Sequence, residues 1–419
     1  MNTKPARRVV VTGLGVVSNV GADVPSTWDS LCNGRSGVSA ITCFPQDEQW
    51  TVRIAGEIRN WEPAKLIEHN TLKRIDRFCA LGMCAAIEAA ADSGFDFANS
   101  DPLRQGVVIG SGIGGILTIE EGHTKLLAGG PRKISPFTVP RLMVNAAAGN
   151  VSIRFNLRGA NSATATACAT GAHAIGHAFH FIQRGDSDIM FAGGSEAAIS
   201  PLCIGSFAAM KALSARNDDP PRASRPFDRD RDGFVLSEGA AVIILEDLEH
   251  AKKRNARIYA EIVGFGSSAD ASHIAAPDPE GLGARAAMQA ALHDAGLNKE
   301  QVDYINAHGT STPLGDAAEI AAVRALFGPH AQKLAVSSTK SMTGHTLGAA
   351  GGLESVATVL AVHDDILPPT INLDHPDVGD DLNLVANTAQ PRKTTIALNN
   401  SFGFGGHNVS LAFAKYTGN

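Results

Sequence analysis

Aromatic residues and long apolar runs are scarce in this sequence, and both absences narrow the possible folds. Aromatic side chains make up 5% of the 419 residues, whereas glycine alone accounts for 43. This composition disfavours an aromatic-rich β sandwich and favours helices packed on sheets through small side chains, as in α/β proteins. No uninterrupted apolar run reaches the ~18 residues that a membrane-spanning helix needs, so we expect no membrane segment.

Paired cysteines and a strong excess of charge are also missing. The six cysteines contain no Cys-x-x-Cys pair, and those within Phe78–Ala86 lie in an apolar stretch typical of buried thiols. The N-terminus lacks the apolar core and cleavage site of a secretory signal. These features predict a reduced, cytoplasmic protein. The net charge of −6 offers no overall attraction to nucleic acid, so we expect no such partner.

Short apolar strand patterns alternate with alanine-rich helical patterns along the chain. This alternation predicts an α/β fold with a largely parallel sheet. The first part of the chain has strand patterns at Arg8–Gly13, Arg104–Gly110, Asp188–Gly193 and Gly239–Leu245, and helical patterns at Phe78–Ser93 and Gly171–Arg184. The second part has strand patterns at Val302–Asn306, Thr394–Leu398 and Val409–Ala414, and helical patterns at Ala284–Ala295, Asp316–Leu326 and Leu347–His363.

The pattern begins again near Arg257, which indicates an internal duplication. The segment IYAEIVGFGSS has the same strand and G-x-G turn as VVVTGLGVVS near the N-terminus. Helix, strand and glycine-rich loop patterns then follow, as in the first part. We therefore predict two similar halves, residues 1–256 and 257–419.

Two motifs in the first half imitate known ligand sites. A G-x-G-x-x-G motif spans Gly110–Gly115, but no strand ends in an acidic ribose partner about twenty residues later, so we favour a tight turn. The sequence DRDRDG begins like a calcium loop, but Gly239 stands where the final glutamate is required. Its charged, proline-rich surroundings, Ser214–Arg231, predict a long surface loop with salt bridges.

Cys168 lies in the run ATACATGAHAIGHA, at the junction of a strand, a turn and a helix. A thiol at a helix N-terminus gains thiolate character from the backbone dipole, and small neighbours let a substrate approach it. A buried structural cysteine is the ordinary alternative for any single cysteine. The junction and its small residues favour a nucleophile.

Two histidines occur in separate glycine-rich loops of the second half. His308, in INAHGTSTPLGD, follows a strand pattern, at the strand end where α/β proteins place ligands. His345, in STKSMTGHTLGAAGG, follows Lys340 and precedes a helix. With Cys168 they suit thioester chemistry, because a thiol attacks a carbonyl and histidines donate hydrogen bonds to an oxygen that becomes negative. A cysteine protease has no evident need for the second histidine. The three residues include no closely spaced pair of ligands, which disfavours a zinc site.

At these residues the chain resembles the thiolase-fold condensing enzymes, specifically the elongating β-ketoacyl-[acyl carrier protein] synthases with a Cys-His-His triad. The matching segments are TACATG at Cys168, NAHGTSTPLGD at His308, KSMTGHTLGAAGG around Lys340 and His345, and NSFGFGGHN from Asn400. The resemblance implies a five-layered αβαβα fold of two similar halves, and a homodimer. It also implies decarboxylative Claisen condensation of an acyl group with malonyl carrier protein in fatty-acid elongation, with no cofactor and no metal ion.

The resemblance also implies roles for individual residues of the reaction site. The backbone N–H groups of Cys168 and Phe404 would form an oxyanion hole for acyl transfer. His308 and His345 would hold the enolate oxygen through Nε2–H, so the tautomer of each ring matters. A supporting polar pair that orients His308 is matched by Lys340 and Glu354. The sequence does not decide whether a structural cation lies near Glu354.

Further positions match the substrate contacts of the family. Thr310 and Thr312 match residues that hydrogen-bond the pantetheine arm, and capping of the following helix is the alternative role. Phe402 and Phe404 lie in SFGFGG, where glycines let a loop move. The family uses such a phenylalanine as a gate between acyl pocket and malonyl site, and simple packing is compatible with that role.

The acyl pocket is expected to differ from that of relatives. Ile113 matches a residue of the pocket wall, where a bulky side chain limits the acyl tail. Thr138, in SPFTVP, matches a position at the pocket base that is often larger and aromatic. A change there would alter the depth or polarity of the pocket, so no chain-length preference is transferred.

The implied partner is an acyl carrier protein that bears acyl or malonyl phosphopantetheine. This carrier is acidic in the family, so its docking face should be locally basic. The candidate docking residues are Lys65, Lys73, Arg74, Arg132, Lys133 and Lys211. Solvated surface charges are the alternative. A ketosynthase of polyketide or specialised lipid synthesis would share the same triad and stays open, whereas a chain-length partner subunit would lack Cys168.

Overall fold

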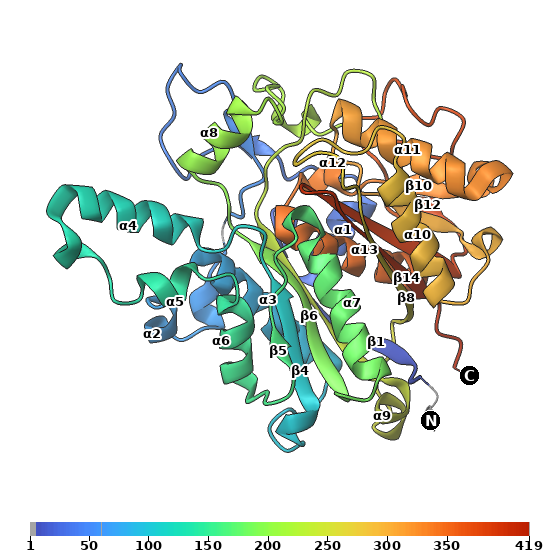
Figure 1. Ribbon diagram of the computed structural model, residues 1–419, viewed down its shortest axis with the longest axis horizontal. Coiled ribbons are helices and arrows are strands. Elements are labelled where there is room, and N and C mark those ends of the chain that lie inside the picture. Colours follow the sequence, from blue (N-terminus) through green and yellow to red (C-terminus); the bar gives the residue numbers. More distant parts are fainter. Residues whose placement is uncertain (1–5, 60, 419) are drawn as a thin grey trace.

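The computed structural model describes residues 6–59 and 61–418, which form a layered α/β structure (Figure 1). In this part of the chain ten strands form one sheet in the order β10-β9-β13-β14-β8-β1-β7-β6-β4-β5. They are β1 (Val9–Ser18), β4 (Gln105–Gly110), β5 (Asn161–Ser162), β6 (Ile189–Glu196), β7 (Gly239–Asp247), β8 (Ala260–Ala269), β9 (Tyr304–Asn306), β10 (Ala335–Ser337), β13 (Ile396–Gly403) and β14 (His407–Ala414). Two short ribbons pair β2 (Ser39–Ala40) with β3 (Ile54–Ala55) and β11 (Ile366–Leu367) with β12 (Gln390–Pro391).

Helices form three layers around these strands. The helices are α1 (Val24–Cys32), α2 (His69–Leu72), α3 (Arg77–Ser93), α4 (Ile116–Gly129), α5 (Thr138–Leu142), α6 (Ala146–Phe155), α7 (Thr170–Gln183), α8 (Pro201–Ala209), α9 (Leu248–Lys253), α10 (Leu282–Asp294), α11 (Pro313–Phe327), α12 (Lys340–Thr343) and α13 (Ala350–Asp364). Helices α3 and α6 pack on the first five strands, and α10 and α11 cover the other five. Helices α7 and α13 lie between the two sets and contact both. The expected five-layered αβαβα fold is confirmed.

The strand order repeats between the two halves of the chain. Strands β1, β4, β5, β6 and β7 are arranged β5-β4-β6-β7-β1, and β8, β9, β10, β13 and β14 are arranged in the same way, β10-β9-β13-β14-β8. The halves meet where β1 pairs with β8, with Val9 opposite Ile262. This repeat confirms the predicted duplication, and the boundary between residues 256 and 257, just before β8, stays a prediction.

The prediction of a largely parallel sheet is wrong. Strand β4 is parallel to β5 and β6, and β9 is parallel to β10 and β13. The remaining pairs, β1–β7, β1–β8, β6–β7, β8–β14 and β13–β14, are antiparallel. Apolar runs identify buried strands but carry no information on their direction. The short turn between β13 and β14 allows only an antiparallel hairpin.

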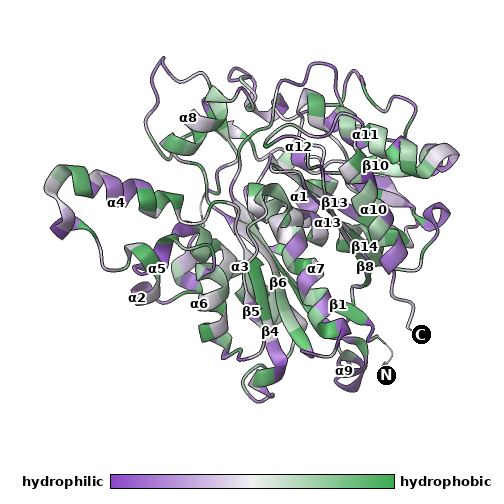
Figure 2. Cartoon of the chain, viewed as in Figure 1, coloured by the Kyte–Doolittle hydropathy of each residue, from purple (hydrophilic) through white to green (hydrophobic). Residues whose placement is uncertain are grey.

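Glycines let the central helices approach each other and the strands. A Cβ on Gly171 of α7 would lie 2.7 Å from the backbone nitrogen of Gly352 of α13. A Cβ on Gly15 of β1 would lie 1.9 Å from the carbonyl oxygen of Ala85 of α3. In Figure 2 the visible strands β5 and β6 are mainly hydrophobic, whereas helices such as α4 and α7 also carry hydrophilic residues. Close packing by small residues explains the scarcity of aromatic side chains and brings the N-termini of α7 and α13 together.

The segment Ser214–Arg231 is only partly a surface loop. Phe227 is fully buried in the core of the second half, and its N–H donates to Asp316 Oδ2 at 2.9 Å. Arg225 and Asp228 form a buried ion pair at 2.9 Å, so the predicted salt bridges are present. The surface prediction fails because charge and proline content do not reveal an apolar residue that inserts into another core. Within residues 6–59 and 61–418, no helix combines the length and apolar character of a membrane span.

Candidate active site

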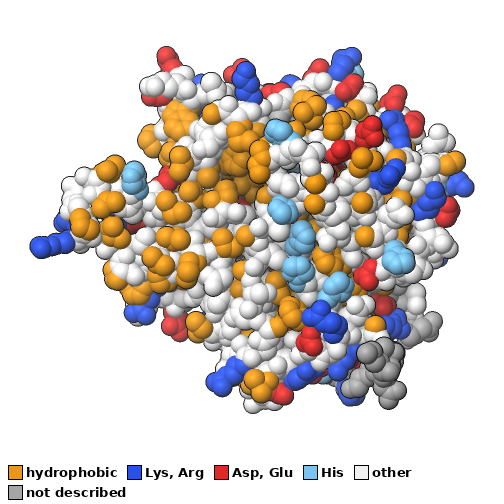
Figure 3. Space-filling model, viewed as in Figure 1, with side chains coloured by type: hydrophobic (Ala, Val, Ile, Leu, Met, Phe, Trp, Pro, Cys, Tyr) orange, Lys and Arg blue, Asp and Glu red, His pale blue; other side chains and the backbone are white. Residues whose placement is uncertain are grey.

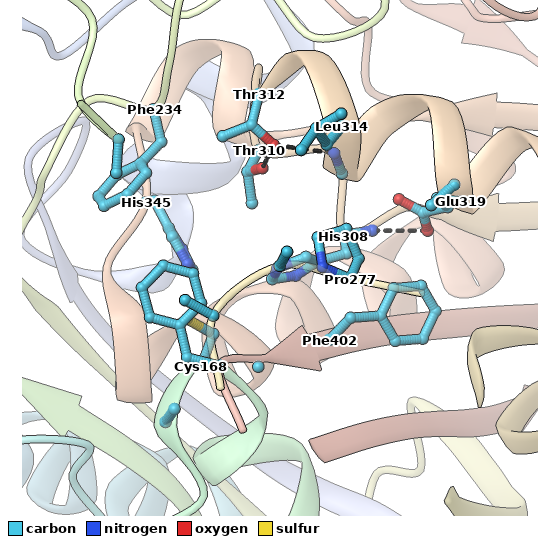
Figure 4. Close-up of a pocket in the computed structure, with 18 of the residues that line it drawn as sticks. Cys168, Phe234, Pro277, His308, Thr310, Thr312, Leu314, Glu319, His345 and Phe402 are labelled. Carbon is cyan, nitrogen blue, oxygen red and sulfur yellow. Dashed lines mark hydrogen bonds between the residues drawn. The ribbon is translucent and has the colours of Figure 1, made fainter. Parts of the chain in front are cut away.

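Loops from both halves of the chain surround one cavity of about 650 Å³. Cys168, His308 and His345 all line it, although they are far apart in the sequence (Figure 4). Cys168 lies directly before α7, His308 follows β9, and His345 follows α12. The structure therefore brings the predicted thiol and both predicted imidazoles to a single site.

Cys168 occupies a tight turn, Ala167–Ala169, just before α7. Ala167 has a φ of +49°, in the left-handed region that L-residues rarely adopt, and such strain is common at functional turns. The turn is held by a hydrogen bond from the Thr166 N–H to Thr170 Oγ1 at 2.8 Å. Gly403 is the last residue of β13, and a Cβ on it would lie 3.0 Å from the Cys168 nitrogen. Glycine at this position therefore lets the end of β13 approach the nucleophile.

The environment of the Cys168 sulfur differs from the expectation of thiolate character. Burial raises the pKa of the Cys168 thiol to about 12, while the charge of Lys340 and a hydrogen bond from the Phe404 N–H act to lower it. Desolvation is the largest of these effects. Burial therefore favours the thiol form, despite the adjoining helix N-terminus.

His308 is fixed by its backbone and by one ring nitrogen. The backbone N–H of His308 donates to Glu319 Oε1 at 2.9 Å, as the dashed line in Figure 4 shows. The backbone N–H of Gly309 donates to Glu319 Oε2 at 2.8 Å. Lys340 Nζ lies 3.4 Å from His308 Nδ1. An ammonium group can only donate, so Nδ1 accepts and Nε2 carries the proton. This tautomer matches the expected role as an Nε2–H donor.

His345 stands edge-on to two aromatic rings. Its ring lies 5.3 Å from that of His308 at 84°, and 5.4 Å from that of Phe234 at 82°. Its backbone N–H donates to the carbonyl of Val235 at 2.8 Å. Its Nδ1 is buried without a hydrogen-bond partner among the described residues. Packing and the backbone therefore orient this ring.

Both imidazoles are held in the neutral form. Burial lowers the pKa of His308 well below 6.5, with further lowering by the charge of Lys340 and by His345. Burial and Lys340 lower the pKa of His345 in the same direction. Neutral imidazoles can each present one N–H to an anionic oxygen without exchanging a proton with it.

Lys340 and Glu354 form an ion pair inside the protein. Both side chains are almost fully buried, and Glu354 extends from α13. A buried lysine needs such a partner, because an unpaired charge is costly in a low-dielectric interior. In the part of the chain that the structure describes, no group of three or more His, Cys, Asp or Glu side chains is placed to hold a metal ion.

The predicted substrate contacts, apart from Thr138, also reach the cavity. Thr310, Phe402, Phe404 and Ile113 line it, as does Thr312. Thr312 is also the N-cap of α11, because its Oγ1 accepts a hydrogen bond from the Gly315 N–H at 3.2 Å. The two threonine hydroxyls lie 3.0 Å apart (Figure 4). The capping role is thus present, and contact with a pantetheine arm stays a prediction.

Thr138 and most of the docking residues lie away from the cavity lining. Thr138 begins α5, where it is half-buried and faces Gly122 of α4. Arg74 stacks over Phe137, 5.3 Å from the ring centroid, beside the same helices. The docking candidates on the exposed surface near α2, α4 and α5 are Lys65, Lys73, Arg74, Arg132 and Lys133. The sixth candidate, Lys211, lines the cavity itself.

Two buried carboxylates that the sequence analysis did not single out shape the His308 loop. Glu319 accepts both N–H groups described above, and Asn400 Nδ2 donates to it at 3.1 Å. Asp316 Oδ1 accepts the N–H of Ser311 at 3.1 Å. Both acids lie on α11 among alanines and are almost fully buried. The sequence did contain a signal for these two residues, because they are acidic residues in an alanine-rich helix that directly follows a candidate catalytic loop.

Two family models match most of the chain. The model described as "Beta-ketoacyl synthase, N-terminal domain" matches residues 6–251, and "Beta-ketoacyl synthase, C-terminal domain" matches residues 259–374. The chain is 53% identical over 409 residues to a protein of Coxiella burnetii named 3-oxoacyl-[acyl-carrier-protein] synthase 2, covering 98% of this chain and 99% of the relative. A protein of the same name from Vibrio harveyi is 51% identical over 410 residues, with 98% and 99% coverage.

Solved structures of related proteins share the fold. A β-ketoacyl synthase from Burkholderia phymatum superposes with a TM-score of 0.90 at 35% identity, covering 98% of this chain and 100% of the other. A type II polyketide ketosynthase, solved in complex with its acyl-carrier protein, has a TM-score of 0.92 at 35% identity, with 98% and 100% coverage.

Proposed function

The chain belongs to the β-ketoacyl synthase family, and from this premise we propose that it condenses an acyl group held on Cys168 with malonyl-[acyl carrier protein] in fatty-acid elongation. The observation that carries the proposal is the meeting of Cys168, His308 and His345 around one cavity. The relatives at 51–53% identity over nearly the whole chain are named 3-oxoacyl-[acyl-carrier-protein] synthase 2. The polyketide ketosynthase is more distant, at 35% identity.

The first half-reaction is acyl transfer from the carrier to the cysteine. The Cys168 sulfur attacks the thioester carbonyl, a new C–S bond forms, and the pantetheine thiol leaves with the proton that the cysteine gives up. Because burial holds the pKa of Cys168 high, proton loss accompanies the attack. The N–H groups of Cys168 and Phe404 would stabilise the negative oxygen of the tetrahedral intermediate. The hydrogen bond from the Phe404 N–H toward the sulfur supports this assignment.

The second half-reaction forms the carbon–carbon bond. Loss of CO₂ from the malonyl thioester leaves an enolate, and His308 and His345 would donate Nε2–H bonds to its oxygen. The enolate carbon attacks the acyl-Cys168 carbonyl, the C–S bond breaks, and the cysteine takes up a proton as the β-ketoacyl product leaves. Lys340 supports this step by holding the His308 tautomer. No redox equivalents are exchanged, so the reaction itself requires no redox cofactor.

The substrates would occupy the cavity that Cys168, Thr310 and Thr312 line. Thr310 and Thr312 would hydrogen-bond the pantetheine arm, while Phe402 and Phe404 would separate the malonyl and acyl compartments. Ile113 belongs to an apolar cluster around the cysteine, which suits the wall of an acyl pocket. No such support exists for Thr138, which is not among the lining residues.

The partners follow from the surface. Basic side chains near α2, α4 and α5 and at Lys211 would attract an acidic acyl carrier protein.

Hydrophobic side chains gather over α4, α5 and α8 (Figure 3). The exposed members include Leu127, Phe137, Val139, Met143 and Leu202. An apolar surface of this kind is typical of an interface, and a homodimer would cover the part of it that lies away from the basic docking residues. All six cysteines lie in the described residues and are free thiols, which supports a reduced, cytoplasmic setting.

The test is extension of a panel of acyl carrier proteins with radiolabelled malonyl carrier protein. Efficient extension of ordinary saturated chains is the expected result. Extension of polyketide starter chains alone would assign the protein to polyketide or specialised lipid synthesis. Absence of any condensation by the purified, folded protein would contradict the proposal.

A further inference from the structure

Glu196 is a fully buried carboxylate with no part in the half-reactions above. It is the last residue of β6 and has no exposed surface. Its hydrogen-bond partners are neutral N–H and O–H groups rather than cations. Ionised carboxylates are costly to bury, and several N–H donors are needed to offset the lost hydration.

The four donors come from two loops that are distant in the sequence. Ser111 Oγ at 2.6 Å and the Ile113 nitrogen at 3.2 Å donate to Oε1, and the nitrogens of Gly112 at 2.8 Å and Gly348 at 3.0 Å donate to Oε2. The first loop follows β4 and carries the acyl-pocket wall. The second loop is the turn after His345. One carboxylate thus bridges the cavity walls on which the acyl chain and the enolate would rest.

The two loops approach so closely that only glycine fits at the contact. A Cβ on Gly112 would lie 2.8 Å from Glu196 Oε2. A Cβ on Gly348 would lie 2.7 Å from the same oxygen and 2.3 Å from the Gly112 nitrogen. The contact therefore has no spare volume, and a change in the length or hydrogen-bonding capacity of residue 196 must be transmitted to both loops.

We infer that Glu196 is a positioning residue that fixes the spacing between the acyl-pocket wall at Ile113 and the turn that follows His345. The inference rests on the proposed function, because the enolate held at His345 must meet an acyl chain aligned by Ile113. Reacting atoms must be held within a few tenths of an ångström for efficient attack. A carboxylate that accepts two hydrogen bonds on each oxygen holds both loops at once.

Substitution of Glu196 tests this role. Glu196→Gln leaves one acceptor oxygen in place of two, and Glu196→Ala leaves none. We expect kcat/KM for condensation to fall about tenfold in Glu196→Gln and about a hundredfold in Glu196→Ala. The ratio of kcat/KM between short and long acyl chains should change by about threefold or more, because the pocket wall moves. Loss of stability alone would not change this ratio.

Glu246→Gln is the matched control. Glu246 is also fully buried, lies on the neighbouring strand β7, and is bonded to Thr12, His250 and Arg254 away from the cavity. The control should lower the melting temperature at least as much as Glu196→Gln while keeping the wild-type chain-length ratio.

Ser111→Ala removes only one of the four hydrogen-bond donors to Glu196. This variant tests the inference if Glu196→Ala does not fold. It should shift the chain-length ratio in the same direction as Glu196→Gln, by a smaller factor. Folded Glu196→Gln and Ser111→Ala variants with the wild-type ratio and rate would overturn the inference. A wild-type protein without condensation activity would instead overturn the proposed function.

Discussion

Lys340 Nζ lies 3.4 Å from His308 Nδ1, and both groups are buried. This contact sets the tautomer of the ring and places a cation behind the proposed enolate site. Lys340→Met keeps a long side chain but removes the donor, so malonyl decarboxylation should fall about 10- to 100-fold. Release of labelled CO₂ from malonyl carrier protein measures the loss.

The same substitution leaves the Glu354 carboxylate buried without its cation. Removing one member of a buried pair costs about 3–5 kcal/mol of unfolding free energy. Lys340→Met/Glu354→Gln should recover much of that stability in chemical denaturation and stay defective in decarboxylation. Normal decarboxylation by Lys340→Met would contradict the tautomer assignment.

Removal of either imidazole should separate the two half-reactions. His308→Ala and His345→Ala should each slow malonyl decarboxylation about 100- to 1,000-fold, because an enolate oxygen loses a preorganised donor. Acylation of Cys168 from acyl carrier protein should change far less. Intact-protein mass and CO₂ release measure the two steps on the same variant. Wild-type decarboxylation in both variants would refute the enolate role.

The pH profile of decarboxylation should extend below the usual range of histidine. Burial, reinforced by Lys340, lowers the pKa of both imidazoles well below 6.5. A lowered histidine pKa means that the neutral N–H donor persists as pH falls through 6.5 and is lost only under more acidic conditions. The decarboxylation rate should therefore stay level from pH ~8 to pH ~6. An acid limb centred on 6.5 would show that the rings titrate freely.

Charge reversal near α5 tests carrier docking. Lys133→Glu and Arg132→Glu should raise KM for acyl carrier protein about three- to tenfold at low salt with little change in kcat, because steering is lost before the chemical step. The matched control is Lys253→Glu. Lys253 is also exposed, but it lies on α9, at the far end of the molecule from α5 (Figure 1). Equal effects of the control and the docking variants would show that only net charge matters.

Local sequence signals predicted the elements and the chemical groups of the site. The strand before His308 and the helix after Cys168 were found within a few residues, because apolar periodicity and small-residue junctions report on local burial. The duplication was also visible, because strand and turn patterns recur near residue 257. Cys168, His308 and His345 meet in space because each of their motifs lies at the end of a strand or helix.

Relationships that depend on tertiary contact were not predictable. Strand direction between β6 and β7 depends on a long intervening segment, and Phe227 enters the core of the other half. The thiolate expectation for Cys168 failed because desolvation depends on how the loops close over the sulfur. Glu196 and Glu319 gave no periodic signal, since their partners are backbone N–H groups of other loops.

The most direct measurement is the site of acylation after the purified protein is incubated with acyl carrier protein. Peptide mass spectrometry should find one acyl group on Cys168, the Cys168→Ser variant should carry none under the same conditions, and added malonyl carrier protein should discharge the acyl group as β-ketoacyl product. An acyl group on another residue, or one that malonyl carrier protein does not discharge, would contradict the account.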